Sequence, residues 1–85
     1  MQIDFHNNFR KQYNKLSVKI KNRFNEKLIK FKDNPLLPEL NNHALQGKYE
    51  GCRSFNVTGD FRVIYEVRGM VVRFLDIDTH SNLYK

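Results

Sequence analysis

The spacing of apolar residues changes from a helical period to a strand period near residue 48, and this change restricts the fold more than any other feature. Before it, Ile20, Phe24, Leu28 and Phe31 recur every three or four residues, which is the spacing of one face of an α-helix. After it, apolar and polar residues alternate, as they do along a β-strand. The sequence therefore predicts an α+β domain with its helices in the first half and its sheet mainly in the second.

The first half is predicted to contain a short strand and two helices. Residues 2–5 alternate polar and apolar, and Asn7 or Asn8 is suited to cap a helix that follows. A second helix is predicted to begin after Ser17. Because Pro35 disfavours helix in the residue before it, this helix should end there, and residues 33–47 should form a loop with at most one helical turn.

Three strand-like runs rich in β-branched and aromatic residues follow, at residues 49–57, 61–67 and 70–77. Short glycine-containing connections separate them, so we expect antiparallel hairpins. Alternation in the middle run places Phe61, Val63, Tyr65 and Val67 on one face and Arg62, Ile64 and Glu66 on the other. The two helices are therefore expected to pack on the first face of a twisted, mainly antiparallel sheet, and to leave the second face largely open for a ligand.

Length, charge and cysteine content limit the possible functions. The 85 residues make one domain, residues 1–85, with a modest core. Fifteen Lys and Arg against nine Asp and Glu give a net charge of +6, which favours a polyanionic partner but does not choose among RNA, DNA, an acidic protein or an anionic membrane. The single cysteine, Cys52, excludes an internal disulfide. Without a long apolar run or a signal peptide, the protein is expected in the cytoplasm.

The second half also carries the polar groups that a metal-free ribonuclease needs. His43 and His80 have side chains that exchange protons near neutral pH, and the guanidinium of Arg62 suits a phosphate. Asp60 is a carboxylate able to support a histidine cation. Tyr84 lies four residues after His80, so a turn in the tail would bring the two side chains together.

Each of these groups also has an ordinary structural interpretation. His43 lies at a loop-to-strand boundary where a solvated or capping histidine is common, and Asp60 is a natural turn residue. Arg53, Arg62 and Arg73 could form cross-strand ion pairs.

The lysines of the second helix have the pattern of a solvated face, although the same face could meet ribosomal RNA. Cys52 is interpreted as a packed small side chain, His6 as a surface residue, and no compact spacing signals a metal site.

The segments His43-Ala-Leu-Gln-Gly47, Asp60-Phe-Arg-Val-Ile-Tyr65 and Thr79-His-Ser-Asn-Leu-Tyr84, with an arginine after the first, resemble the RelE/ParE toxin superfamily of bacterial toxin–antitoxin systems. The resemblance is closest to the YafQ subgroup. It implies the RelE-like α+β fold and a toxin that cuts mRNA in the ribosomal A site without a cofactor or metal. The implied partners are a cognate antitoxin protein, mRNA and ribosomal RNA, with no membrane.

Carried over by position, the resemblance implies a catalytic set, and the sequence adds a set of residues expected to bind RNA. The catalytic set is His43, Asp60, Arg62, His80 and Tyr84, in which Arg62 matches the RelE-type arginine at the scissile phosphate. The residues expected to bind RNA are Lys48, Arg53, Asn56 and Arg73.

The sequence also departs from the subgroup. Ser54 and Asn56 stand where an acidic residue and a further histidine are usual, and Asp78 stands where glycine is usual. An asparagine cannot transfer a proton. Two alternatives to the ribonuclease therefore remain: a ParE-like inhibitor of DNA gyrase, and a catalytically silent binding module with the same fold.

Overall fold

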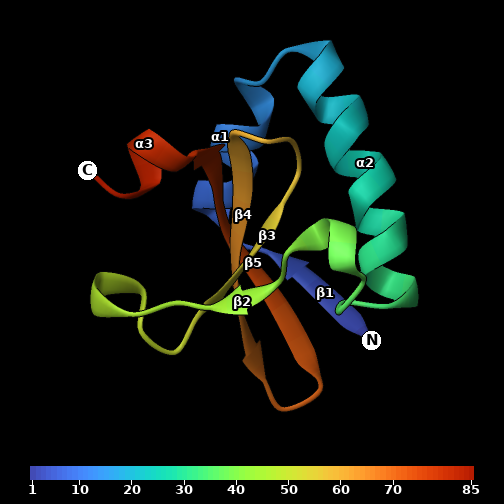
Figure 1. Cartoon of the computed structure of the whole chain (residues 1–85), viewed down its shortest axis with the longest axis vertical. Coiled ribbons are helices and arrows are strands. Elements are labelled where there is room, and N and C mark those ends of the chain that lie inside the picture. Colours follow the sequence, from blue (N-terminus) through green and yellow to red (C-terminus); the bar gives the residue numbers. More distant parts are fainter.

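The computed structural model describes all 85 residues as a five-stranded sheet with two long helices on one face (Figure 1). The strand order is β1-β5-β4-β3-β2, in which β1 pairs with β5 in parallel and every other pair is antiparallel. This confirms the predicted α+β class and the mainly antiparallel sheet. The strands are β1 (Gln2–Phe5), β2 (His43–Ala44), β3 (Arg53–Asn56), β4 (Phe61–Arg68) and β5 (Val71–Thr79).

The helices are α1 (Asn7–Asn14), α2 (Val18–Asp33) and the short α3 (His80–Leu83). α2 begins after Ser17 as predicted, and Ser17 caps it, since its hydroxyl accepts a hydrogen bond from the backbone N–H of Ile20 at 3.2 Å. The cap of α1 was predicted wrongly. It is His6, whose Nδ1 accepts from the N–H of Asn8 at 3.1 Å. The backbone N–H of His6 still donates to Phe74 O, so the extended chain continues to His6 and the helix starts after it.

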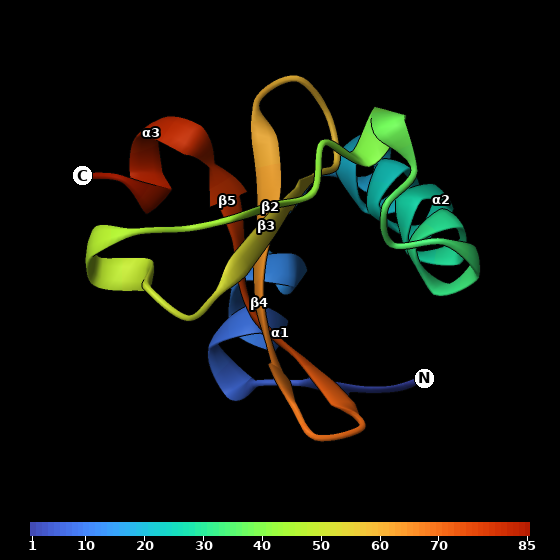
Figure 2. The ribbon, with the colours of Figure 1, turned by 60° about the horizontal axis from the view of Figure 1, so that its bottom comes forward.

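Aromatic side chains fill the space between the helices and the sheet. Phe31 of α2 stacks on Phe55 at 4.8 Å between ring centroids, and Phe74 meets the rings of both. Phe9 and Phe24 extend the same core toward α1. Figure 2 shows α2 on one side of the sheet and α3 on the other. The apolar face of α2 therefore packs on the sheet as the sequence predicts.

The segment before β3 differs from the prediction. Residues 49–57 were predicted as one strand, but only Arg53–Asn56 is extended, and a 3₁₀ turn occupies Gly47–Tyr49. The turn closes because the N–H of Glu50 donates to Gly47 O at 3.1 Å, and Gly47 and Gly51 have positive φ angles of 66° and 88°. Within the predicted loop 33–47, Pro38–Leu40 forms the single helical turn expected, and β2 is an additional short strand that the sequence did not reveal.

The second face of the sheet is less open than predicted. Ile64 has no exposed surface, and a second small cluster covers it with Leu45 from the segment after β2 and Leu83 from α3. Tyr49, Cys52 and Leu75 pack around these three residues. The segment between β2 and β3 and the C-terminal α3 thus cover one part of the face, and the polar remainder of that face borders this cluster. No helix in the structure has the length and apolar character needed to cross a bilayer.

Candidate functional site

A backbone hydrogen bond brings two of the predicted site residues together. The N–H of His80 donates to the carbonyl oxygen of Asp60 at 3.0 Å, and this bond ties the start of α3 to the turn between β3 and β4. Thr79 caps α3, since its hydroxyl accepts from the N–H of Asn82 at 3.2 Å. The Thr-His sequence therefore begins a helix at the end of β5, and the His80 side chain is exposed.

Two aromatic rings continue this patch from His80. The rings of His80 and Tyr84 lie 4.7 Å apart at an interplanar angle of 45°, as the spacing of four residues predicted. Tyr84 in turn meets Tyr49 edge to face at 5.7 Å, and the Tyr49 hydroxyl donates to Leu83 O at 2.9 Å. Burial raises the pKa of Tyr49, so its hydroxyl stays protonated as a donor at neutral pH.

Tyr49 is a site residue that the sequence did not indicate, because its position depends on the turn before β3. The same turn brings in Lys48, whose ammonium group lies 5.1 Å from the centre of the Tyr49 ring. Lys48 was expected to bind RNA, and the structure places this cation at the aromatic wall formed by Tyr49 and Tyr84.

A polar row crosses the strands next to this wall. Asn56, Arg62 and Asp78 are register partners on β3, β4 and β5. The Nε of Arg62 and the Oδ1 of Asn56 are both buried and have no hydrogen-bond partner in the protein. The Nη2 of Arg62 makes only a long contact of 3.4 Å with Gly59 O. Buried polar groups are normally paired, so these two atoms have unused hydrogen-bonding capacity, and a side-chain rotation is needed to present it to a ligand.

His43 lies one row further along the same face. It pairs with Ser54 of β3, which is the register partner of Ile64. This row and that of Arg62 are two residues apart along the strands, or roughly 7 Å. The Nδ1 of His43 is 2.8 Å from the carbonyl oxygen of Asn41. Because a carbonyl only accepts hydrogen bonds, Nδ1 carries the proton in the neutral ring, and Nε2 is the proton acceptor.

Arg53, by contrast, faces the helices. Its Nε donates to Asn42 Oδ1 at 2.9 Å, and the Asn42 amide donates to the hydroxyl of Tyr65, a residue of the main core. Alternation along β3 places Ser54 and Asn56 on the other face, so the structure does not bring Arg53 together with Arg62.

Arg73 is also distant from the His80 patch. It lies between Asp4 of β1 and Glu66 of β4 in the sheet register, and it lines a separate hollow with Arg10 and Arg68. Arg53 and Arg73, both expected to bind RNA, therefore lie outside the cluster around His80.

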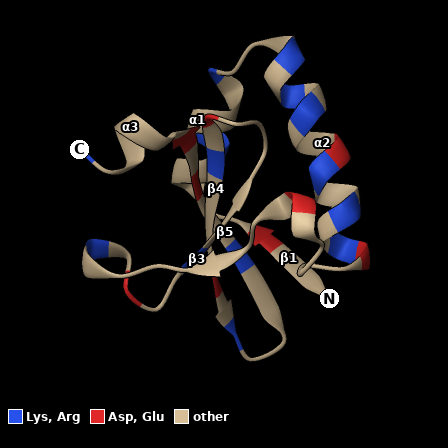
Figure 3. Ribbon diagram, viewed as in Figure 1, with Lys and Arg blue, Asp and Glu red and all other residues tan.

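The remaining candidates follow their structural interpretations. Cys52 packs in the second cluster, and burial raises the pKa of its thiol, so it is protonated at neutral pH. Basic residues recur along the length of α2, between acidic and uncharged ones (Figure 3). Two of them share one negative charge, because Lys27 and Lys30 lie 2.9 and 3.0 Å from the carboxylate of Glu39. These ion pairs hold the Pro38–Leu40 turn against α2.

The whole chain, residues 1–85, matches the family model described as the bacterial toxin of type II toxin–antitoxin system, YafQ. Comparison with curated protein sequences gives no significant match.

Solved structures with the same fold include known toxins. The crystal structure of YafQ from E. coli strain BL21(DE3) superimposes with a TM-score of 0.82 at 26% identity, and 99% of this chain and 98% of that chain are covered. The YafQ chain in the E. coli DinJ–YafQ toxin–antitoxin complex gives 0.77 at 27% identity, covering 99% and 97%. A YoeB/ParE toxin from Agrobacterium tumefaciens, at 18% identity, TM-score 0.77 and coverage of 94% and 99%, shares the fold.

The match over all 85 residues agrees with the observed helix and strand order and with the motif positions around His80, and on this basis the chain belongs to the YafQ family of type II toxin–antitoxin toxins.

Proposed function

We propose that this toxin is a ribosome-dependent mRNA endoribonuclease that inhibits translation. The observation that carries the proposal is the backbone hydrogen bond that ties His80 to Asp60 at the end of β5, next to the β4 strand that carries Arg62, whose Nε is buried and unpaired. A proton-transferring imidazole, a carboxylate and a guanidinium with free hydrogen-bonding capacity are the groups required for cleavage at a phosphodiester.

The reaction is a transesterification within the RNA. The Nε2 of His43 accepts the proton of a ribose 2′-OH, and the 2′-oxygen forms a bond to the adjacent phosphorus in line with the leaving group. The bond from phosphorus to the 5′-oxygen breaks, and protonated His80 supplies the proton that this oxygen needs. The products are a 2′,3′-cyclic phosphate and a 5′-hydroxyl, and the step needs no metal or cofactor.

Arg62 and Asp60 each stabilise a charged group in this scheme. The guanidinium of Arg62 binds the phosphate and stabilises the additional negative charge of the transition state. Asp60 stabilises the protonated ring of His80 and so keeps the acid in its working form. Tyr84 and Tyr49 stack on an unpaired base, and stacking of this kind contributes on the order of 1–3 kcal/mol. Lys48, beside Tyr49, contacts the RNA backbone.

The proposed partners are a cognate antitoxin and the ribosome. E. coli YafQ has been crystallised with the antitoxin DinJ. The net charge of +6 suits an acidic antitoxin segment that folds on contact as well as the phosphates of ribosomal RNA. Co-expression with the antitoxin gene is expected to restore growth, and the antitoxin should co-purify with this chain.

The direct test is cleavage of mRNA on purified ribosomes by the wild-type chain, followed as a new 5′-hydroxyl end. In cells, labelled methionine incorporation should stop within minutes of induction while plasmid supercoiling stays normal. Loss of supercoiling before translation stops would instead indicate gyrase inhibition. Asn56, which cannot transfer a proton, favours the silent binding module, and the absence of cleavage on ribosomes that bind the protein would establish that alternative.

A further inference from the structure

A hollow of about 640 Å³ lies beside the proposed cleavage site, at the edge of the sheet. It exists because β1 pairs only with Val71–Phe74 of β5, so the rest of β5 has no neighbouring strand on that side. The C-terminal end of α1 and the tail around α3 form its two walls. Its chemically distinctive lining residues are Lys15, Phe61, Asp76, Asp78, Asn82 and Lys85.

The hollow is continuous with the residues proposed to act on the phosphate. Asp78 is the register partner of Arg62, and Thr79, which also lines the hollow, directly precedes His80. Adjacent strands lie about 4.8 Å apart. A nucleotide whose phosphate rests on Arg62 therefore has its next base within reach of the hollow.

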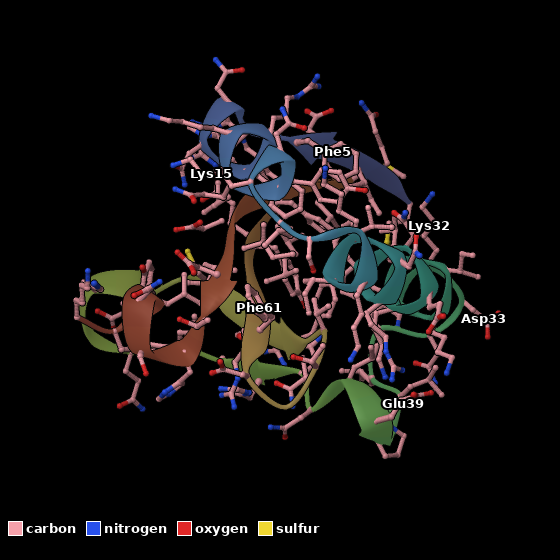
Figure 4. The ribbon with its side chains drawn as sticks, turned by 90° about the horizontal axis from the view of Figure 1, so that it is seen from above. Phe5, Lys15, Lys32, Asp33, Glu39 and Phe61 are labelled. Atoms are coloured by element: carbon pink, nitrogen blue, oxygen red, sulfur yellow. The ribbon has the colours of Figure 1, made fainter.

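The lining combines an aromatic surface with hydrogen-bond acceptors. Phe61 packs against the main core but is only half-buried, and at the sheet edge its ring lines the hollow, where it can contact a base (Figure 4 labels Phe61 on the sheet and Lys15 at α1). The Oδ1 of Asp78 accepts from Thr79 N at 2.7 Å and from Asn82 Nδ2 at 3.0 Å, which fixes the carboxylate and leaves its second oxygen for a ligand. Asp76 is fixed in the same way, since its Oδ1 accepts from Ile77 N at 2.8 Å.

The charges are also arranged for a nucleotide. The two carboxylates lie on the strand at the base of the hollow, whereas the exposed Lys15 and Lys85 come from the walls. Carboxylates repel phosphate and accept hydrogen bonds from the amino groups of bases, while exposed lysines attract phosphate. A nucleotide bound with the edge of its base toward Asp76 and Asp78 and its phosphates toward the lysines meets both of these charge preferences.

We propose that this hollow holds the unpaired mRNA base next to the scissile phosphate, and that Asp76 and Asp78 select bases with amino groups over uracil. The proposal rests on the ribonuclease function proposed above. Adenine, cytosine and guanine each present an amino group to a carboxylate, whereas uracil presents its one polar N–H between two carbonyl oxygens that a carboxylate repels. Single-stranded RNA is commonly recognised in this way, by stacking together with hydrogen bonds to the base edge.

The test compares cleavage of ribosome-bound mRNAs that differ only in the base beside the cleavage site. The wild-type chain should cleave messages with adenine, cytosine or guanine about tenfold faster than the message with uracil, a ratio typical of one good base contact. Asp78→Asn keeps the oxygen that accepts from Thr79 and Asn82 and replaces the other with an amide donor. It should reduce this ratio about tenfold. Asp33→Asn, at the exposed end of α2, is the matched control and should leave the ratio unchanged.

A second measurement separates the base site from the catalysis. In NMR titrations of the wild-type chain with the four nucleoside 5′-monophosphates, the amide signals of Phe61 and Asp78 should shift more with AMP, CMP and GMP than with UMP. If the chain cleaves RNA but Asp78→Asn and Asp76→Asn keep the wild-type ratio, the base site is wrong and the ribonuclease stands. If Asp78→Asn slows all four messages equally by weakening ribosome binding, the hollow contacts ribosomal RNA and the mRNA site is overturned.

If no RNA is cleaved, the ribonuclease fails and the titration decides the hollow alone. Shifts at Phe61 and Asp78 that favour the amino-bearing nucleotides would support a nucleotide site. No shifts, or equal shifts with UMP, would overturn it.

Discussion

The backbone N–H of His80 donates a hydrogen bond to the carbonyl oxygen of Asp60 at 3.0 Å. This bond joins the end of β5 to the β3–β4 turn, two segments that lie 20 residues apart in the sequence. Since α3 begins at His80, the same bond sets where the C-terminal helix starts and therefore which way the imidazole and Tyr84 point. A change in this turn would move the proposed acid relative to Arg62.

Replacing His80 with alanine should remove cleavage and leave folding intact. General acid–base groups typically contribute 10²- to 10⁴-fold in rate, so single-turnover cleavage of ribosome-bound mRNA by His80→Ala should fall by about that factor. Because His80 is exposed, the free energy of unfolding should change by no more than about 0.5 kcal/mol. Quenched-flow cleavage and urea denaturation measure the two quantities.

The control for this experiment must respect the cap of α1. His6→Ala would remove the Nδ1 that accepts from Asn8 N, and loss of such a cap typically costs about 1 kcal/mol. His6→Asn removes an imidazole outside the proposed site but retains a capping acceptor, and it should cleave at the wild-type rate. Equal rates for His80→Ala and His6→Asn would remove His80 from the mechanism.

Asn56→His should increase cleavage. Asn56 is the register partner of Arg62, and its Oδ1 is buried without a partner, so an imidazole there would lie beside the proposed phosphate site. An imidazole transfers protons near neutral pH and an amide does not, so we expect the single-turnover rate to rise at least about tenfold. Asn22→His, on the exposed face of α2, is the matched control and should give no increase. A folded Asn56→His chain with the wild-type rate would show that proton transfer at this position is not limiting.

Phe31→Ala should destabilise the protein strongly. Phe31 is 1% exposed and its ring contacts those of Phe55, Tyr65 and Phe74, so its removal leaves a cavity in the middle of the main core. Substitutions of this kind cost about 3–5 kcal/mol. Ile29→Ala, on the exposed face of the same helix, should cost less than about 1 kcal/mol, because Ile29 is 70% exposed. Thermal and urea unfolding would contradict this account of the core if the two variants were equally stable.

Asp76→Asn should stabilise the protein at neutral pH. Burial raises the pKa of the Asp76 carboxyl, and the charge of Asp78 adds to the effect. The folded chain therefore holds this proton more tightly than the unfolded chain, in which an aspartate has a pKa of about 3.9. The stability that this proton binding contributes is complete below the unfolded pKa of about 3.9. It is lost as the pH rises through the raised pKa of the folded chain. Urea midpoints should therefore favour Asp76→Asn at pH 7 and differ less at pH 3.5.

Glu39→Gln should change the stability at neutral pH in the opposite direction to Asp76→Asn. Hydrogen bonds from Lys27 and Lys30 lower the pKa of Glu39, so its charged form stabilises the fold above the pKa of an unfolded glutamate, about 4.3. That contribution is lost as the pH falls through the lowered pKa. Glu39→Gln should therefore be less stable than wild type at pH 7, and the difference should shrink in acid. Identical pH profiles for the two variants would contradict both assignments.

Part of the candidate site was predictable from local spacing. The four-residue interval between His80 and Tyr84 predicted the contact of their rings, because residues i and i+4 share a face of a helical turn. Alternation along β4 likewise separated Arg62 from the core residues Val63 and Tyr65. The opposite orientation of Arg53 was not predicted, because the structural strand begins only at Arg53 and its face depends on the contact with Asn42.

The sequence by itself determined the α+β class, the start of α2 after Ser17 and the positions of β4 and β5, since each depends on periodicity or capping within a few residues. Only the tertiary structure decided which segments meet. The turn that places Tyr49 against Tyr84, the parallel pairing of β1 with β5, and the hollow beyond the end of β1 all join residues that are distant along the chain. Such contacts depend on sheet register and on the packing of Leu45 and Leu83 over Ile64, and no local pattern of residues encodes them.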